Sequence, residues 1–256
     1  MNVLLRTILT LLVFSRAPAF ASVEPINDTQ SQSSQTQNQA NTKLFKHSLS
    51  GLYGINSFRL STSQPYSDFN TLYSKAHQAQ YELETICKSV ALQTHSQALF
   101  SGIKSQQRAQ TKIKTDLSND VSKITDVARG TIVTNDIEGL VTTFELLENQ
   151  TKIVSVKNRF KNPTPSGYRD LNVLVQLPKT KIIAEVQIHL AEIAHVKNGP
   201  EHELYENIQH IERNAAASNR ALTQLEQAKI KQLRQQSINL YHNAWQPYIT
   251  TKIKAA

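Results

Sequence analysis

The apolar residues of this chain change their spacing twice along the sequence, and this change constrains the fold more than any other feature. The segment from Tyr66 to about Leu99 contains no Gly or Pro, and its apolar residues recur mostly at steps of three and four. That spacing predicts one long amphipathic helix, broken at most once. Four later segments carry β-branched or alternating apolar residues between Gly, Pro or Asn and predict strands, namely 127–133, 152–159, 171–177 and 181–188.

Helical spacing also occurs between and after these strands. Residues 136–149 have apolar residues on one face and begin with acids that suit a helix N-terminus. From Glu201 to about Trp245 the apolar residues follow a near-heptad spacing, and Pro247 is expected to end this helix. A helix hairpin within the chain is the favoured interpretation of that stripe. Self-association through the C-terminal helix is the alternative.

This order of elements predicts an α+β fold with a β-α-β-β-β core. A mixed β-sheet of about four to five strands is expected to be flanked by helices, with long helical N- and C-terminal extensions. The predicted organisation is a helical segment over 43–98, a core over 99–207 and a helical extension over 208–256.

The first 42 residues have the features of an export signal followed by a tether. Residues 1–21 combine Arg6, an apolar run over residues 8–14 and the small-x-small sequence Ala19-Phe20-Ala21, which predicts a signal peptide cleaved near Ala21. The apolar run is too short to span a bilayer, so no stable membrane insertion is expected. Residues 22–42 are rich in Gln, Ser and Asn and predict a disordered linker, because they lack the apolar surface that would offset the entropy of ordering. We therefore expect an exported protein, periplasmic or secreted; an N-terminal helix kept in a cytosolic protein is the alternative.

The composition fits a globular core with an anionic partner. With 39% hydrophobic residues and a single Cys, Cys87, the chain is neither collagen-like nor a disulfide scaffold. Its 28 Lys+Arg against 20 Asp+Glu give a net charge of +8, which favours nucleotide phosphate, nucleic acid or a membrane surface as partner.

Part of this charge is concentrated in residues 104–114, which contain no acid. The spacing of four between Lys104, Arg108 and Lys112 would align them on one helix face. Like charges there repel one another unless an anion such as polyphosphate lies between them. An ordinary solvated basic face is the alternative.

Two carboxylates are candidates for metal binding. Asp126 precedes the first strand, and Glu185 lies inside an apolar strand, where an acid requires a partner. A magnesium ion bridging both carboxylates and a polyphosphate would supply that partner. The alternative is that Glu185 and Gln187 both point to solvent from alternate positions of their strand.

The loop from Lys157 to Asn172 contains two prolines and a glycine, and Tyr168 stands near its end with cations on both sides. An aromatic ring beside Arg can stack on a base while the cation holds a phosphate. Simple surface decoration of the loop is the alternative.

Taken together, these residues resemble the RelA/SpoT nucleotidyltransferase family, the (p)ppGpp synthetases, over about residues 99–207. The segment 157–172 aligns without a gap with the family pattern Lys-Asp-x-Ile-x-x-Pro-Lys-x-x-Gly-Tyr-Arg-Ser-Leu-His, and residues 185–188 are similar to Glu-Val/Ile-Gln-Ile. Upstream, Lys104-Ser105 with Lys112 is similar to the ATP-binding Arg-x-Lys-Ser…Lys segment of the family, and residues 124–128 are similar to its Asp-Ile-Ala-Gly. Downstream, Glu201-His202 followed by Tyr205 is similar to the Leu-Glu-His and Tyr-Lys of the small synthetases.

The resemblance implies a nucleotidyltransferase-like sheet and a magnesium-dependent pyrophosphokinase. Such an enzyme moves the β,γ-diphosphate of ATP to the 3′-hydroxyl of a nucleotide acceptor and releases AMP, as in the synthesis of guanosine tetraphosphate-type alarmones. It implies that Asp126 and Glu185 hold magnesium and that Glu185 also helps to deprotonate the attacking hydroxyl. The residues that it assigns to ATP and phosphates are Lys104, Arg108, Lys112, Arg129, Lys157 and Arg159. Those that it assigns to the acceptor are Tyr168, Arg169, Asn172, Gln187 and His202, with Tyr168 stacking on the base.

Departures from the family pattern affect the expected substrate. Gly102 stands where the ATP-site Arg is usual, and Arg129 or Arg108 is expected to compensate for it. Thr164 and Asn172 replace a Lys and a His of the loop pattern, so acceptor recognition is expected to be altered. GDP or GTP, adenine nucleotides and the 3′ end of tRNA are the open acceptors.

Export and nucleotide chemistry can be combined in two ways. The first is an exported effector or toxin that acts on nucleotides inside another cell. The second is a catalytically inactive exported protein that retains a nucleotide-binding or helical interaction module. No segment resembles the family's hydrolase or regulatory domains, so a synthetase-only member is expected.

Overall fold

The computed structural model describes residues 42 and 44–250. The predicted signal peptide and nearly all of the predicted linker lie outside these residues. No helix in the described part of the chain is long and apolar enough to cross a membrane.

The described part is built around one mixed sheet of six strands in the order β1-β4-β5-β6-β3-β2. Only β3 and β6 pair in parallel, and the other neighbours are antiparallel. The strands are β1 Phe58–Arg59, β2 Gln97–Leu99, β3 Arg129–Thr134, β4 Lys152–Asn158, β5 Leu171–Gln176 and β6 Ile183–Leu190. The predicted α+β class and mixed sheet are thus confirmed, and the predicted count of four to five strands is too low. The short edge strands β1 and β2 have too few residues for a readable alternation.

The helices of the described residues are α2 Leu49–Gly54, α3 Phe69–Ser74, α4 Ala76–Gln93, α5 Gln106–Asp116, α6 Ile137–Gln150, α7 Ala191–Asn198, α8 Pro200–Ala217 and α9 Gln224–Ile249. The long helix expected from Tyr66 onward is divided at Lys75, which ends α3 and precedes α4. Helix α6 follows its expected range, and the Asp136 side chain caps it by accepting a hydrogen bond from the Gly139 backbone at 2.7 Å.

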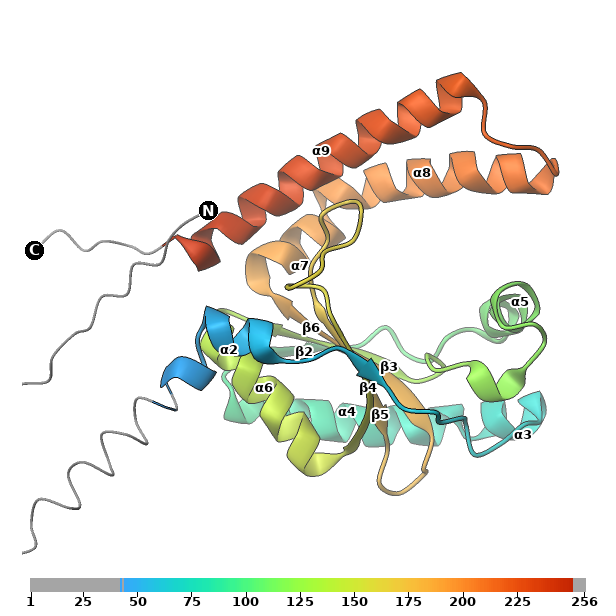
Figure 1. Cartoon of the computed structure of the whole chain (residues 1–256). Helices are drawn as coiled ribbons and strands as arrows, with labels where there is room; N and C mark the ends of the chain where they lie inside the picture. The colour runs from blue at the N-terminus through green and yellow to red at the C-terminus, as the bar shows by residue number, and fades with distance from the viewer. Residues whose placement is uncertain (1–41, 43, 251–256) are drawn as a thin grey trace, which may run out of the picture. The chain divides into compact units, whose positions relative to one another are not determined.

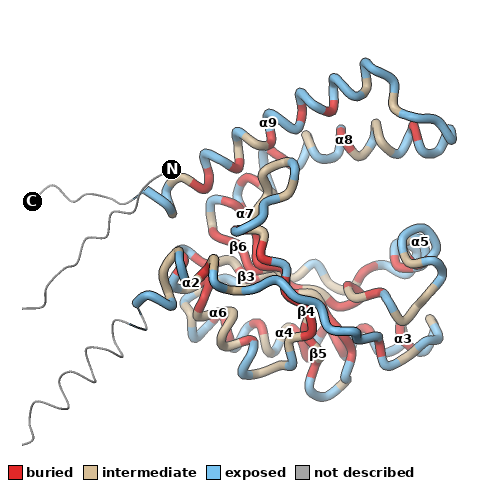
Figure 2. Tube along the Cα trace, in the orientation of Figure 1, coloured by how far each residue is buried: buried red, intermediate tan, exposed pale blue. Residues whose placement is uncertain are grey.

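The hydrophobic core lies between the sheet and helices α4 and α6, which pack on the same side of it (Figure 1). Buried residues follow the strands, whereas α5 is largely exposed (Figure 2). A Cβ added to Gly130 of β3 would lie 3.6 Å from the Cys87 sulfur of α4, so even-numbered residues of β3 face these helices. Cys87 itself is fully buried, and burial raises the pKa of its thiol to about 12.

The chain after the sheet returns over the other side of it through α7, α8 and α9 (Figure 1). Helices α8 and α9 form a hairpin with a small core of its own around Ile208, Ile230 and Leu233. The apolar stripe of this segment is therefore covered mainly within the chain. Leu225 is an exception at 84% exposure.

The expectation that Pro247 ends the last helix is wrong, because α9 continues through it to Ile249. Proline removes one backbone donor and clashes with the preceding turn, and α9 contains this residue within its last turn. The start of α9 is fixed by a capping box between Thr223 and Glu226.

Candidate active site

The sheet face opposite α4 carries polar side chains from four neighbouring strands. Residues that pair directly across strands share a face, because side chains alternate along each strand. Gln187 of β6 pairs with Asn172 of β5, which in turn pairs with Lys157 of β4. Two positions earlier in β6, Glu185 pairs with Arg129 of β3. The fold therefore brings together on one face five residues that the sequence analysis assigned to the site.

A cavity of about 910 Å³ lies on this face, lined by residues of the sheet, of the loop before β5 and of helices α5, α7, α8 and α9. Seven predicted site residues line it, namely Arg108, Arg129, Arg159, Tyr168, Glu185, Gln187 and His202. Six predicted residues are outside its lining, namely Lys104, Lys112, Asp126, Lys157, Arg169 and Asn172.

Glu185 is the carboxylate of this cavity that comes from the centre of the sheet. It is half-buried, and its Oε1 accepts a hydrogen bond from the Asn172 amide at 2.5 Å. Asn172 is itself buried and thus supports Glu185 without lining the cavity itself. Gln187 accepts a hydrogen bond from the Lys197 ammonium at 2.9 Å. The alternation thus directs Glu185 and Gln187 into the cavity, and not into open solvent.

Two cations near this carboxylate also line the cavity. Lys197 of α7 enters the cavity, and burial lowers its pKa although Asp170 and Glu185 oppose that effect. The Arg129 side chain lines the cavity, and its Nε is buried without a hydrogen-bond partner among the described residues. An unsatisfied buried donor of this kind is costly and suits a site that receives an anionic ligand.

Tyr168 lies in the cavity wall within a polar network. Its hydroxyl donates to Asp170 Oδ2 at 2.8 Å and contacts His189 Nε2 at 2.6 Å. Asp170 is fully buried and accepts two further hydrogen bonds from one guanidinium nitrogen of Arg159, at 2.7 and 2.8 Å. Tyr241 of α9 meets the Tyr168 ring edge-on, with 5.6 Å between the centroids.

Asp126 forms a second, adjacent charged cluster with two lysines. The ammonium groups of Lys104 and Lys112 each lie 2.9 Å from its Oδ2. Burial by itself would raise the pKa of Asp126, but these two ammonium groups hold it below its ordinary value. An anion therefore does lie between the lysines, and it is the chain's own carboxylate.

The expectation that Lys104, Arg108 and Lys112 share one helix face is wrong in one respect. Lys104 precedes Ser105, the N-cap of α5, and is not in the helix. Gly102, with φ of +70°, turns the chain just before it. This left-handed conformation favours glycine over the Arg of the family pattern. Lys104 can thereby reach Asp126 from outside the helix.

Two predicted loop cations are placed away from the cavity lining. Arg169 donates to the Phe160 carbonyl at 2.7 Å and lies over the Trp245 ring, 5.1 Å from its centroid. Its guanidinium thus contacts α9, in contrast to the acceptor role expected for it. Lys157 is exposed at its position on the polar sheet face.

Sequence reasoning missed several cavity residues. Lys197, His189 and Tyr241 were not predicted, and Glu201 was noted only as part of a motif. The Tyr241 hydroxyl donates to Glu201 at 2.9 Å, and burial raises the pKa of that carboxyl. Alternation in β6 from Glu185 could have indicated His189, whereas the sequence carries no signal that α7 and α9 return over the sheet.

The residues fit a magnesium ion supplied together with a polyphosphate. No group of three or more metal-binding side chains occurs within residues 42 and 44–250, so a cage made by the protein alone is not present there. Magnesium usually needs only one or two carboxylates when phosphates and water complete its shell. Asp126 Oδ1 is buried and has no hydrogen-bond partner in the described part, as expected for an oxygen available to a cation.

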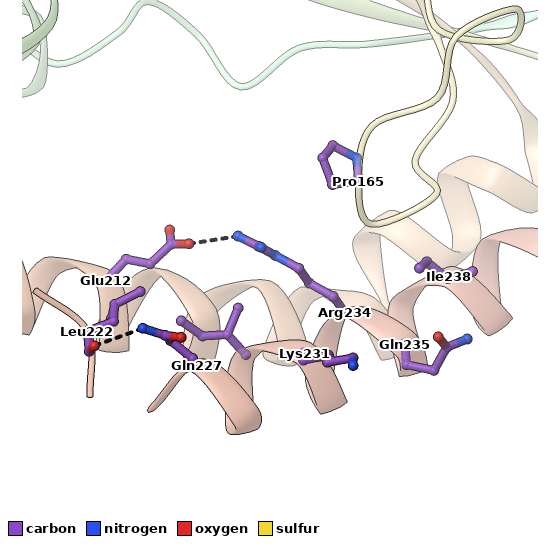
Figure 3. A pocket seen from close by; sticks show the side chains of 9 residues that line it. Pro165, Glu212, Leu222, Gln227, Lys231, Arg234, Gln235 and Ile238 are labelled. Carbon is purple, nitrogen blue, oxygen red and sulfur yellow. Dashed lines mark hydrogen bonds and ion pairs between the residues drawn. The ribbon is translucent and has the colours of Figure 1, made fainter. Parts of the chain in front are cut away.

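A smaller pocket of about 320 Å³ lies between α8 and α9 and includes Pro165 of the loop. Figure 3 shows Arg234 extending toward Glu212 across its mouth, and these two side chains form an ion pair at 2.9 Å. None of the predicted site residues lines this pocket. The candidate site is therefore the larger cavity over the sheet.

Comparison with known families supports the resemblance found in the sequence. Residues 101–210 match the family described as "Region found in RelA / SpoT proteins". The chain is 29% identical over 129 residues to a protein named "(p)ppApp synthetase toxin Tas1" from Pseudomonas aeruginosa (strain UCBPP-PA14). The match covers 50% of this chain and only 28% of that relative.

Solved structures share the fold. The complex between the Type VI effector Tas1 and its immunity protein matches with a TM-score of 0.50 at 23% identity, covering 70% of this chain and 96% of that one. The small alarmone synthetase 2 from Bacillus subtilis matches with a TM-score of 0.50 at 18% identity, with coverage of 70% and 96%. At these identities the likeness establishes a common fold.

Proposed function

We propose that the chain is an ATP-dependent nucleotide pyrophosphokinase, since residues 101–210 match the family described as "Region found in RelA / SpoT proteins". The observation that carries this proposal is the cavity over the sheet, whose lining combines the sheet carboxylate Glu185 with the cations Arg129, Arg159 and Lys197. Transfer of a diphosphate needs little covalent help from protein, and mainly positioning and charge compensation. A cavity built from cations with one central carboxylate meets both needs.

In the proposed reaction, the 3′-hydroxyl oxygen of the acceptor attacks the β-phosphorus of ATP. A new bond forms between them, the bond from the β-phosphorus to the oxygen that bridges to the α-phosphorus breaks, and AMP leaves with that oxygen. The hydroxyl proton passes to the Glu185 carboxylate. Asn172, through its hydrogen bond to Oε1, holds Glu185 in orientation for this step.

The cations stabilise the charge that moves from the β-phosphorus to the leaving AMP. Arg129 and Arg108 line the cavity, and we assign them to the phosphates of ATP. The ammonium groups of Lys104 and Lys112 contact Asp126 in the structure. With Asp126 serving as a metal ligand, both ammonium groups would be free to bind the phosphates.

Magnesium, when bound, would neutralise phosphate charge and orient the diphosphate. Asp126 and Glu185 are the residues that would hold it, together with the phosphate oxygens. The unpartnered Oδ1 of Asp126 supports this assignment.

We propose an adenine nucleotide as the acceptor, since the curated relative is named a (p)ppApp synthetase toxin. The loop substitutions Thr164 and Asn172 support an altered acceptor, because they remove a cation and an imidazole that the family pattern carries. GDP, GTP and the 3′ end of tRNA are the competing acceptors that the test must include.

The test is release of AMP from ATP by the chain without residues 1–21, in the presence of magnesium and one acceptor at a time. We expect AMP and a pyrophosphorylated adenine nucleotide in equal amounts. The Glu185→Gln variant is expected to lower the rate at least about 100-fold, because the proton acceptor is lost. Glu203→Gln, at an exposed position of α8, is the matched control and should leave the rate unchanged.

Each outcome of this assay has a defined meaning. Product formed only with GDP, or only with tRNA, would show that this molecule is the acceptor and would overturn the choice of an adenine nucleotide. Nucleotide binding without AMP release by the wild type would refute the enzyme and favour an inactive binding module.

We further propose that the protein is exported after cleavage near Ala21 and acts as an effector or toxin. The small-x-small sequence at 19–21 and the named toxin relative support this proposal. Fractionation of native cells, with N-terminal sequencing, should find a chain that begins at Ser22 outside the cytosol. Uncleaved protein confined to the cytosol would contradict the proposal.

A further inference from the structure

The Tyr168 hydroxyl is held by two buried groups, and their hydrogen-bond capacity fixes the arrangement. Asp170 is paired with Arg159 and therefore accepts, so the Tyr168 hydroxyl donates to it. The remaining contact, to His189 Nε2 at 2.6 Å, then requires that His189 carries its proton on Nε2 and donates to the Tyr168 oxygen. His189 is 1% exposed, and burial lowers its pKa, which keeps the ring neutral as this arrangement requires.

The Tyr168 ring is also confined on its sides. Its centroid lies 5.6 Å from that of Tyr241, 5.7 Å from that of His189 and 5.7 Å from the Arg159 guanidinium carbon. The loop that carries it is locked to α9 at Gly167, whose φ is +83°. A Cβ at Gly167 would lie only 3.2 Å from a backbone carbon of α9. The ring therefore cannot swing without breaking hydrogen bonds or moving a helix.

The buried carboxylate of this network stands at a position where the chain departs from the loop pattern that it resembles. The loop pattern has Ser after the Tyr-Arg pair, whereas this chain has Asp170. Burying that carboxylate is costly, and burial raises its pKa although Arg159 opposes the shift. Because the buried Asp170 carboxylate lies next to the Tyr168 ring that lines the cavity, its energetic cost indicates that it serves to position this ring more than to stabilise the fold.

We propose that Asp170 and His189 are positioning residues that hold the Tyr168 ring as the acceptor-side wall of the cavity. They act through the Tyr168 hydroxyl and leave the ring to contact the base. This inference rests on the proposed function for the identity of the ligand. It predicts that the acceptor affinity depends on the network while the ATP affinity does not.

The experiment is a double-mutant cycle on nucleotide binding, using the chain without residues 1–21. Two constants are measured by calorimetry with magnesium: Kd for α,β-methylene ATP, in which the bond to be broken cannot be cleaved, and Kd for ADP with that analogue saturating. Tyr168→Phe and His189→Leu, which removes the ring donor, should each weaken ADP binding about tenfold and change the analogue's Kd less than about twofold. The double variant should lose no more than Tyr168→Phe alone, because the hydrogen bond from His189 is already absent without the Tyr168 hydroxyl.

Glu82→Gln is the matched control, because Glu82 is likewise a buried carboxylate and caps the turn before β6 by accepting from the Lys179 and Thr180 backbones. It should lower thermal stability without changing the ratio of the two Kd values. NMR of His189 in the wild type should show a neutral ring protonated on Nε2.

The outcomes separate this inference from the proposed reaction. Losses of ADP affinity that multiply to about a hundredfold in the double variant, or equal losses for both nucleotides, would overturn the positioning role. A wild type that binds both nucleotides with the expected coupling but releases no AMP would refute the reaction and leave the positioning role intact. Failure of the wild type to bind either nucleotide would overturn both.

Discussion

Replacing Asp126 with Asn tests whether the cluster of Lys104, Lys112 and Asp126 depends on this one carboxylate. In the structure Asp126 Oδ2 lies 2.9 Å from the ammonium groups of both Lys104 and Lys112. The Asp126→Asn change keeps the size and shape of the side chain and removes its charge. Two ammonium groups then face a neutral amide, whose oxygen can still accept from both but whose missing negative charge no longer balances theirs.

The expected cost follows from how exposed the two lysines are. Hydrogen bonds to charged groups contribute about 1.5 to 3 kcal/mol each, and more is lost when the remaining partner stays buried. The Lys104 side chain is 10% exposed and cannot recover its hydration, whereas the Lys112 side chain is 32% exposed and recovers much of it. We therefore expect a loss of about 3 kcal/mol in the free energy of unfolding, most of it due to Lys104, and a fall in Tm of about 6 to 12 °C.

Urea unfolding at pH 7 measures this loss, and the double change with Lys104→Met should recover part of it, because no buried charge is then left unpaired. The pKa of Asp126 is lowered in the folded state. Its contribution is therefore complete above the unfolded pKa, about 4, and is lost as the pH falls through the lower folded pKa. The difference between wild type and variant should shrink below about pH 4. A loss under about 0.5 kcal/mol at pH 7, or a difference that grows in acid, would refute the reasoning.

Three further predictions concern packing around the site. Gly167→Ala should lower the free energy of unfolding by about 1 to 2 kcal/mol in a thermal melt, because Gly167 has a positive φ and an added Cβ would lie close to α9. Gly54→Ala is the control and should lower it by less than about 0.5 kcal/mol, because an added Cβ there has open space around it. Arg169→Met should change the emission of Trp245, the single tryptophan, and destabilise the chain by about 1 kcal/mol; an unchanged spectrum would contradict the contact. Cys87, with its pKa raised to about 12, should not react with a thiol reagent at pH 8 until urea unfolds the chain, and rapid labelling of the native protein would show that it is not buried.

Local patterns in the sequence were sufficient for the central elements of the fold. Strands β3 to β6 and helix α6 lie within two residues of their expected ranges, because alternation and three-to-four spacing report directly which side of an element is buried. The edge strand β1 was missed because two exposed residues carry no period, and the residues of β2 were instead included in the helix expected up to about Leu99. Continuation of α9 through Pro247 was missed because a helix can continue through a proline, and the local sequence does not mark this exception.

The residues of the candidate site also divide into those whose place the sequence predicted and those whose place it did not. Glu185, Gln187, Tyr168 and Arg129 were identified in advance, since the ordered motifs that carry them are short stretches of sequence. Arg169 shows the limit of such motifs. It follows Tyr168 directly in the chain, but successive residues of an extended segment point in opposite directions, and its guanidinium contacts Trp245 of α9.

The amino-acid sequence was enough to predict the four central strands, helix α6, the RelA/SpoT resemblance and many residues of the cavity lining, because these are written in short stretches of neighbouring residues. The tertiary structure alone decided which side chains meet. It placed Lys197 and Tyr241 in the cavity through the return of α7 to α9, joined Asp170 to His189 through Tyr168, and set Asp126 between two lysines. These contacts depend on strand register and helix packing, which bring together groups far apart in the sequence and which no local spacing encodes.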